Sequence, residues 1–565
     1  MALITFLISP LGPSLLLVLG AILSLTIGRW LRRPEWLAGV ALLFIGLAGW
    51  LLLFLRSQVA VVPTFSHPWR PILQVGTNLY WISDGWNWYI AGLVLLLGGL
   101  GILLDLNSDY VHQGRRIHTS LAVQLAVLAA ALLFVSSGNL LTAILTWVLL
   151  DVCILLRSTT RPLVANLQSD TPIEHHRGLS LLGAMLLLIA LLPAGPTGPG
   201  QEFQGGTLPV ESVLLLALAA LIRAGVYPFH LWLLPERRTQ VTVAERLLEQ
   251  MVPTLCGLWL LGWTYGLGRD YILLRLDVLA VFLLALLGSA VAAWTATNQN
   301  DHHSFVLISS AGLAALTGAL TYSEGPSAMI WPTTAFALGG GLWLVGERVW
   351  QGWGWTLPVS IGALTLAGVP LTPGFLAQPS LARLWEPGSV LQLLFGVYVL
   401  AQSLQIAALL RSWEDVERPT PTDLLPNGAK ARLLIASVAL GLPLAIAGFL
   451  PRAVAALASM PNAIPPGLGD PPSIVAKEGT IWFTLVAPLL LGFGLVWLRP
   501  KIWHVIGGSA NRLQTLIQLN WLFNSGWWVM QYTSELWGNV TRVVEGAGYM
   551  GWLLVFALLG YLLMN

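Results

Sequence analysis

Long apolar runs recur along the whole chain and limit what it can fold into. Sixteen segments of roughly 20 predominantly apolar residues alternate with polar connections, and about 20 such residues let a helix cross the hydrocarbon core of a bilayer. Hydrophobic residues make up 56% of the 565 residues and charged residues 10%, against roughly 25% charged in a soluble domain. These values exclude a soluble globular protein, and the net charge of +2 is too small to favour nucleic acid as a partner.

The basic residues give the orientation of these spans. With the N-terminus outside, nineteen of the 28 Lys and Arg residues fall in the inner connections and seven in the outer ones, as the positive-inside rule requires. The first run ends in "RWLRRPEW", which predicts an anchor rather than a cleaved signal. The sequence therefore predicts an all-α polytopic membrane protein with both termini outside. Its spans are expected near 4–27, 35–55, 82–104, 119–136, 139–156, 178–194, 209–227, 248–267, 276–297, 304–321, 329–347, 356–377, 391–410, 432–450, 480–498 and 548–564.

Residues 510–545 fit no span and predict an amphipathic helix on the inner, cytoplasmic face. Apolar groups recur along one face of this helix while polar groups occupy the rest. At 1.5 Å per residue it would reach roughly 50 Å. It would either lie on the lipid surface or act as a strut along neighbouring helices. The apolar face is formed by Leu513, Ile517, Trp521, Trp528, Leu536 and Val540.

Ionisable residues inside the spans are few, and in lipid such groups mark pathways or pairs. Asp84, Asp277, Glu347 and Arg348 lie near span ends, where solvated side chains are expected. Asp151, in "TWVLLDVCILL", lies deeper and is the stronger functional candidate. The two cysteines, at 153 and 256, lie in apolar runs and are read as buried hydrophobic groups rather than as a disulfide or metal pair.

A charge cluster is expected where the seventh and eighth spans meet. Glu245 and Glu249 share a helix face, Arg246 is three residues before Glu249, and Arg223 lies across a short turn. One interpretation is a buried ion-pair network that holds two helices together. The other is a proton path in which the glutamates carry protons and Arg223 sets their pKa, because arginine does not release its proton.

Prolines interrupt two apolar runs. Pro228 lies in "VYPFH", ahead of His230, and Pro370 and Pro373 lie in "AGVPLTPGF". Discontinuous helices in corresponding positions of two halves point to an ion site in transporters built from inverted repeats. We therefore expect a repeat of spans 4–8 and 9–13. The predicted regions are 1–118, 119–267 and 268–411 for the first three spans and the two repeats, then 412–509, 510–547 and 548–565 for spans 14–15, the amphipathic helix and the last span.

Four motifs resemble the antiporter-like membrane subunits of respiratory complex I and of Mrp-type sodium/proton antiporters. They are "AGVYPFHLWLLPE", "WISDGWNWY", "GNLLTAILTWVLL" and "LAGVPLTPGFLAQ". Sixteen spans, outer termini and a lateral helix before the last span are similar to the distal, longest subunit of complex I. The resemblance covers nearly the whole chain. It implies a fold with broken seventh and twelfth spans and a relay of lysines and glutamates that moves protons.

The chain departs from that relay at most of its positions. The family's glutamate after the fifth-span tryptophan is Val148, and its seventh-span lysine is Arg223. The eighth-span histidine falls at Glu249, and the twelfth-span lysine is Gln378. A rerouted path would run from Asp151 through Glu249 and Glu245, gated by Arg223, to His302 and His303, since histidine titrates near neutral pH.

Three functions remain open. The first is a membrane-arm subunit of a complex-I-like NADH–quinone oxidoreductase, with a degenerate or rerouted proton path. The second is a structural spacer that has lost pumping, and the third is a subunit of an Mrp-type antiporter or of an ion-coupled inorganic-carbon system. No motif in this chain binds a cofactor, so quinone, flavin and iron–sulfur clusters are expected in partner subunits. Expected partners are other membrane subunits, including sister antiporter-like chains, in an energy-transducing membrane such as the bacterial inner membrane.

Overall fold

The computed structural model describes most of the chain. The described residues are 8–28, 30, 34–57, 62–68, 78–106, 117–159, 174–194, 202–206, 208–234, 241–268, 276–385, 390–414, 427–460, 463 and 479–545. They form two compact units, Met1–Gly507 and Gly508–Asn565, which are described separately.

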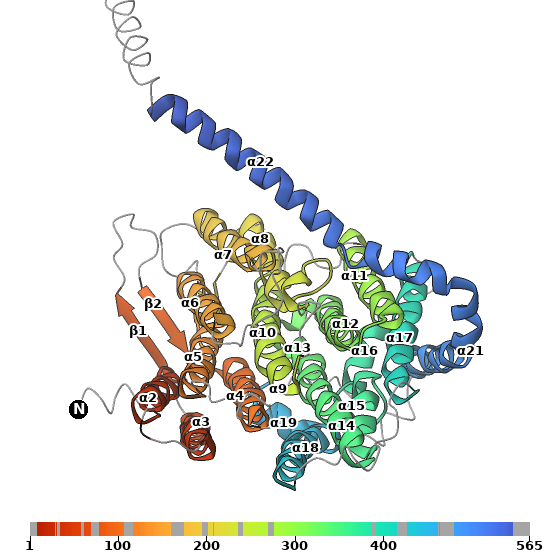
Figure 1. Cartoon of the computed structure of the whole chain (residues 1–565), viewed down its shortest axis with the longest axis horizontal. Helices are drawn as coiled ribbons and strands as arrows, with labels where there is room; N and C mark the ends of the chain where they lie inside the picture. Colours follow the sequence, from red (N-terminus) through yellow and green to blue (C-terminus); the bar gives the residue numbers. More distant parts are fainter. Residues whose placement is uncertain are drawn as a thin grey trace, which may run out of the picture. The chain divides into compact units, whose positions relative to one another are not determined.

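The first unit is a bundle of apolar helices, as the sequence predicts (Figure 1). One small antiparallel sheet, β1 (Thr64–Pro68) with β2 (Asn78–Ile82), pairs Thr64 with Ile82. The helices of its first half are α2 (Gly12–Ile27), α3 (Pro34–Ser57), α4 (Gly85–Asp105), α5 (Ile117–Val135), α6 (Leu140–Thr159), α7 (Glu174–Ala194), α8 (Val210–Ala224), α9 (Val243–Glu245) and α10 (Val252–Leu267). Those of its second half are α11 (Leu276–Thr295), α12 (Gln299–Leu320), α13 (Pro326–Thr334), α14 (Gly340–Trp353), α15 (Leu357–Leu366), α16 (Gln378–Ala382), α17 (Leu391–Glu414), α18 (Asn427–Phe449) and α19 (Pro451–Leu457).

The helices match the predicted spans closely. Eleven helices in the described part of the chain are long and apolar enough to cross a membrane, so the chain is an all-α integral membrane protein. Fifteen of the predicted spans coincide with described helices, and the sixteenth, 548–564, lies outside the described residues. The total of sixteen spans and the inverted repeat remain predictions.

Irregular turns interrupt the central helices. A π-helical segment, η4 (Arg246–Met251), precedes α10, and a second, η6 (Ala335–Gly339), joins α13 to α14. A π-turn widens the helix by one residue per turn and is frequent at functional sites. Both predicted helix breaks also coincide with helix ends. α8 ends at Ala224, with Gly225 in the left-handed conformation, and α15 ends at Leu366, shortly before Gly368 at φ 76°.

The predicted continuous helix over 510–545 is wrong. α21 (Gly479–Ile517) runs on from the fifteenth predicted span, and α22 (Asn520–Glu545) begins only after Leu519, which takes a φ of 56°. A leucine in the left-handed region interrupts the hydrogen-bonding pattern, and the sequence carries no proline or glycine there to announce it. α22 has the predicted spacing of aromatic groups, with Trp528 and Tyr532 stacked at 5.8 Å between ring centroids.

The core of the bundle depends on close contact between backbones as well as on large side chains. Trp86, Trp147, Trp259 and Trp343 are almost completely buried. Where α10 crosses α8, however, a glycine lies at the contact. A Cβ on Gly257 would overlap the backbone of Ala224 and the carbonyl carbon of Arg223.

We therefore expect Gly257→Ala to destabilise the bundle. Overpacking a tight contact costs about 1–3 kcal/mol, which exceeds the gain of about 1 kcal/mol from replacing a helical glycine. The apparent Tm in detergent should fall. Gly92→Ala is the matched control, because a Cβ there meets nothing within 4 Å. Equal Tm values for the two variants would contradict the proposed backbone contact.

Candidate functional site

An ion pair joins the broken helix α8 to its neighbours. Arg223, in the last turn of α8, is 1% exposed. Its Nη1 lies 2.6 Å from Oδ1 of Asp151 on α6, and its Nη2 donates to the carbonyl of Trp147 at 3.3 Å. The guanidinium also lies 3.8 Å from the centroid of the Trp147 ring, a cation–π contact that stabilises a desolvated cation. Both oxygens of Asp151 accept from the Ser180 hydroxyl at 2.9 Å.

Asp151 lies three residues after Val148 on α6. The family resemblance implies a glutamate at position 148 and a lysine at position 223. In this chain a carboxylate nearly one helical turn further along α6 reaches Arg223 on α8.

The predicted network around Arg223 does not form as one cluster. In the described part of the chain, the carboxylate partner of Arg223 is Asp151 and neither Glu245 nor Glu249. Glu245 forms a capping box instead: its Oε2 accepts from the Thr242 N–H at 2.9 Å, and its own N–H donates to the Thr242 hydroxyl at 3.2 Å. The sequence T-V-A-E at 242–245 is the local signal for this cap.

Glu249 belongs to a second group, which the sequence analysis missed. Its Oε1 lies 3.3 Å from Nε of Arg157, at the end of α6. Nη2 of Arg157 lies 3.6 Å from Oδ2 of Asp105, at the end of α4, and Gln124 donates to the same Asp105 oxygen at 2.7 Å. Asp105 and Arg157 each end a span that is predicted to finish at the cytoplasmic side, and this shared level in the membrane is the sequence signal for their contact.

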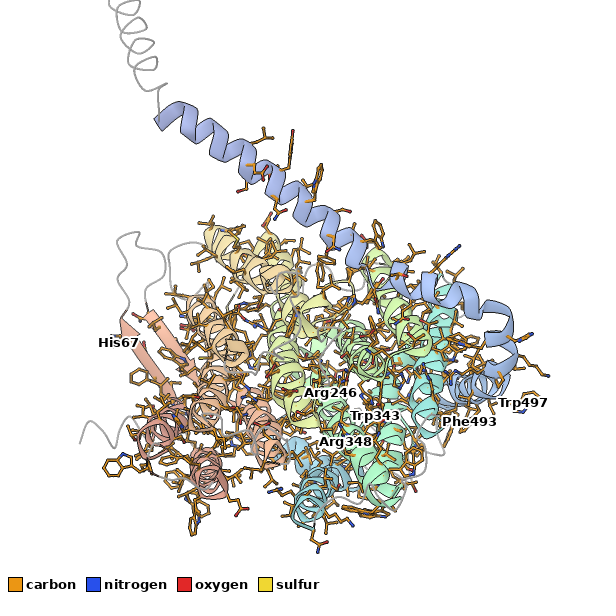
Figure 2. All side chains as sticks on the ribbon, in the orientation of Figure 1. His67, Arg246, Trp343, Arg348, Phe493 and Trp497 are labelled. Carbon is orange, nitrogen blue, oxygen red and sulfur yellow. The ribbon has the colours of Figure 1, made fainter. Side chains whose placement is uncertain are left out.

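Arg246 forms a third group with uncharged partners. It opens the π-helical segment η4 and is 1% exposed; Figure 2 places it in the interior of the bundle. Its Nη2 donates to Oδ1 of Asn300 at 2.8 Å, and its Nη1 donates to the hydroxyl of Ser304 at 3.1 Å and to Oε1 of Gln250 at 3.3 Å. The expected pair with Glu249 is absent from the described contacts of Arg246, because the π-turn alters the spacing on which that expectation rested.

A buried acid–imidazole pair lies beside this group. Nε2 of His303 is 2.5 Å from Oε2 of Glu347, and Gln299 donates to the other carboxylate oxygen at 2.8 Å. Glu347 is 3% exposed, so the prediction of a solvated Glu347 is wrong, whereas the next residue, Arg348, is exposed as predicted. Glu347 lies on the side of α14 that faces α12. Arg348 lies about 100° further around the α14 axis.

His302 and His303 contact the same tryptophan but differ in their hydrogen bonds. Their rings lie edge-on to Trp343 at 6.1 and 5.2 Å between centroids. Nδ1 of His302 is 3.1 Å from the Ala293 carbonyl. Because a carbonyl only accepts, this contact requires a proton on Nδ1. Of the two, His303 lies within ion-pair distance of a carboxylate, that of Glu347, among the described residues.

The remaining predicted site residues lie at the helix breaks. His230 is fully buried, with Nδ1 3.1 Å from the Pro228 carbonyl and its ring stacked on Tyr227 at 4.9 Å. In the second half, Pro370 and Pro373 lie in the turn between α15 and η7 (Phe375–Ala377), which leads into α16. Gln378, at the start of α16, is 2% exposed and accepts weakly from the Tyr398 hydroxyl at 3.5 Å.

Two acidic residues at span ends differ in burial. Asp277 is exposed, as expected. Asp84 is partly buried and caps α4, accepting from the N–H of Asn87 and from Gln204, both at 2.8 Å. Within the described residues, no group of three His, Cys, Asp or Glu side chains is arranged to hold a metal.

The Arg223–Asp151 pair generates a stability prediction. Asp151→Asn leaves a buried guanidinium without its counter-charge, which costs about 3–5 kcal/mol in fully buried pairs. A smaller loss, on the order of 2–3 kcal/mol, is expected here because the Asp151 side chain is 24% exposed. Adding Arg223→Gln should restore part of the apparent Tm, and the exposed Asp277→Asn should leave it unchanged. A double variant less stable than Asp151→Asn alone would contradict the pairing.

The comparisons with known proteins find similarity in fold and no match by sequence. No family model matches the sequence, and no curated protein matches it significantly. In structure, the chain is similar to a chain of the Mrp complex from Dietzia sp. DQ12-45-1b, with a TM-score of 0.74 and 18% identity over 97% of this chain and 62% of that one. It therefore spans less than two thirds of the length of the Mrp chain.

The chain is also similar to a chain of respiratory complex I from Thermus thermophilus with bound NADH. The TM-score is 0.59, with 18% identity over 80% of this chain and 99% of that one. Both likenesses match the family to which the sequence motifs point. The chain therefore has the fold of the antiporter-like membrane subunits of complex I and Mrp complexes.

Proposed function

We propose that the chain is a proton-translocating membrane-arm subunit of a complex-I-like, quinone-linked oxidoreductase, with a rerouted proton path. The observation that carries this proposal is the buried His303–Glu347 pair. Burying an imidazole and a carboxylate in apolar surroundings costs free energy, and inside a membrane such groups mark ion pathways. The fold likeness and the sequence motifs support the class of complex.

The proposed path uses titratable groups held between fixed charges. Asp151, Glu249, His303 and Glu347 are able to exchange protons, whereas Arg223, Arg157 and Arg246 are not. Glu347 enters the path through its pair with His303, and Glu245 is assigned a capping role instead.

The serine and glutamine side chains beside Arg246 extend this path. Gln250 donates to the Leu233 carbonyl at 2.7 Å and to the Ser304 hydroxyl at 3.2 Å. Ser304 in turn donates to the Asn300 carbonyl at 3.1 Å. Asn300 and Ser304 lie on α12, the helix that also carries His303. A proton leaving His303 would therefore have hydroxyl and amide groups nearby that form hydrogen bonds.

One observation favours a redox-free alternative. The similarity to the Mrp chain covers 97% of this chain, more than the 80% covered by the complex I chain. An Mrp-type cation/proton antiporter subunit, or a subunit of an ion-coupled inorganic-carbon system, would use the same fold without a quinone. A spacer subunit would keep the fold and lose the path. Variants and partners separate these functions.

Replacing Glu347 tests the path. Glu347→Gln keeps the shape and removes the exchangeable proton, so membrane vesicles that contain the whole complex should lose most of their coupled proton uptake. The measurement is fluorescence quenching of a pH dye after a donor and quinone are added. Glu211→Gln is the matched control, because Glu211 is exposed in the first turn of α8. Unchanged uptake in Glu347→Gln would support the spacer function instead.

Copurification tests the class of complex. Mass spectrometry of the proteins that accompany this chain in mild detergent should find iron–sulfur and quinone-site subunits beside sister antiporter-like chains. Antiporter subunits without redox proteins would replace the oxidoreductase proposal with redox-free exchange. A chain purified alone would refute both assignments to a multi-subunit complex.

A further inference from the structure

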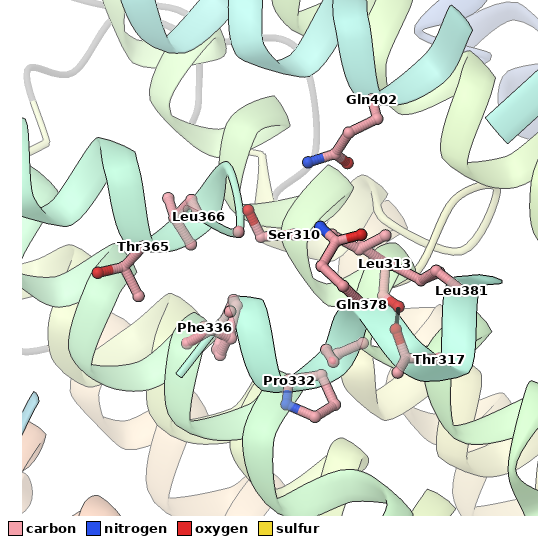
Figure 3. A pocket seen from close by; sticks show the side chains of 15 residues that line it. Ser310, Leu313, Thr317, Pro332, Phe336, Thr365, Leu366, Gln378, Leu381 and Gln402 are labelled. Carbon is pink, nitrogen blue, oxygen red and sulfur yellow. Dashed lines mark hydrogen bonds between the residues drawn. The ribbon is translucent and has the colours of Figure 1, made fainter. Parts of the chain in front are cut away.

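A small cavity lies in the second half of the bundle, between helices α12, α13, α15, α16 and α17 and the π-helical segment η6 (Figure 3). The space open to the centre of a water molecule is about 20 Å³, and one water needs roughly 10–15 Å³ of such space. The cavity therefore has room for one or two waters. Its polar lining comes from Ser310, Thr317, Thr365, Gln378 and Gln402.

Gln402 is the residue whose unpartnered amide indicates a ligand in this cavity. Its side chain is 1% exposed, and neither its amide nitrogen nor its amide oxygen has a hydrogen-bond partner among the described residues. Figure 3 shows the amide directed towards the space beside Ser310 and Gln378. A buried polar group without a partner costs about 1–3 kcal/mol, so a ligand that satisfies Gln402 would be held firmly.

The chemistry of an amide decides which ligand fits. The oxygen of Gln402 needs a donor and its nitrogen needs an acceptor. A water molecule supplies both. A sodium ion would satisfy the oxygen alone and would face the two N–H groups, and no carboxylate lines the cavity to balance its charge. The unpartnered amide therefore points to water and against a metal cation.

Ser310 is oriented to accept a second contact from such a water. Its hydroxyl donates to the Val306 carbonyl at 2.8 Å and accepts from Nε2 of Gln405 at 2.9 Å. One lone pair of the oxygen is then left for the cavity. Gln405 is itself fully buried on α17, three residues after Gln402, so one face of α17 positions both groups.

A second cavity lies further along α12. It measures about 10 Å³, near the lower limit for a single water, and is lined by Leu233, Gln250, Thr254, Ser304, Leu307 and Phe336. This is the cavity beside the Arg246 group, since Gln250 and Ser304 both bond Arg246. Phe336 is the one residue that lines both cavities.

Phe336 lies on the π-helical segment η6 and is 1% exposed. An aromatic ring between two cavities is a barrier to water. π-Helical segments such as η6 are frequent at functional sites. We propose that the Gln402 cavity binds water as a proton relay, and that the Phe336 ring closes it from the cavity at Gln250 and Ser304. This inference rests on the proposed function and narrows the transported ion to the proton.

Passive leak tests this inference without a redox partner. The chain, with the subunits that accompany it, is reconstituted into liposomes, and proton and sodium leak are measured under a potassium diffusion potential. Phe336→Ala should join the two cavities and raise the proton leak about tenfold, with sodium leak unchanged. Adding Gln402→Leu, which keeps the volume and removes the amide, should return the leak to the wild-type rate.

Two further variants make the result decisive. Phe395→Ala is the matched control, because Phe395 is buried on α17 and lines neither cavity. Phe336→Leu keeps an apolar side chain and should give a smaller rise in proton leak. It serves as the test variant if Phe336→Ala does not assemble. No rise in either Phe336 variant, or a rise that Gln402→Leu leaves intact, would overturn the relay. A leak that carries sodium equally would overturn the assignment to water.

The failure of this inference is distinct from that of the proposed function. Loss of coupled uptake in Glu347→Gln together with unchanged leak in the Phe336 variants would leave the proposed function standing and remove the relay. Unchanged uptake in Glu347→Gln with a Gln402-dependent leak would remove the proposed path and keep the water site.

Discussion

A guanidinium that is 1% exposed in an apolar bundle needs a partner, and Arg223 imposes this requirement on three helices. Asp151 on α6 supplies the charge, Trp147 supplies a carbonyl and a ring face, and Ser180 on α7 holds the carboxylate. The same residue lies one position before the last residue of α8, where Gly225 turns the chain out of the helix. A single pair thus links α8, α6 and α7 directly before the break at Gly225.

The charges of the bundle are distributed over separate groups rather than joined in one network. Arg223 has Asp151, Arg157 has Glu249 and Asp105, and Arg246 has amides and hydroxyls with carboxylates only at longer range. Each of the three cations therefore has its own set of ion-pair and hydrogen-bond partners.

Much of the fold followed from the sequence, because lipid requires helices of a known length and their apolar runs are visible. The site was less predictable. Asp151 was found from its depth in a span, but Glu347 was misread because its burial depends on α12, which no local pattern reveals. Arg246 and Glu249 were paired by α-helical spacing, and a π-turn removes that spacing. The start of α22 was missed because Leu519 adopts a positive φ without a glycine.

Gln378 stands where the family resemblance implies a lysine. An amide neither titrates nor carries a charge, so the proposed proton path through this region depends on a molecule held there. The unpartnered amide of Gln402 and the free lone pair of Ser310 are the groups able to hold a water, and both lie in a lining without charge. In this proposal, selectivity for protons arises because no carboxylate lines the cavity. A sodium ion finds no counter-charge in this lining, whereas a hydrogen-bonded water needs none.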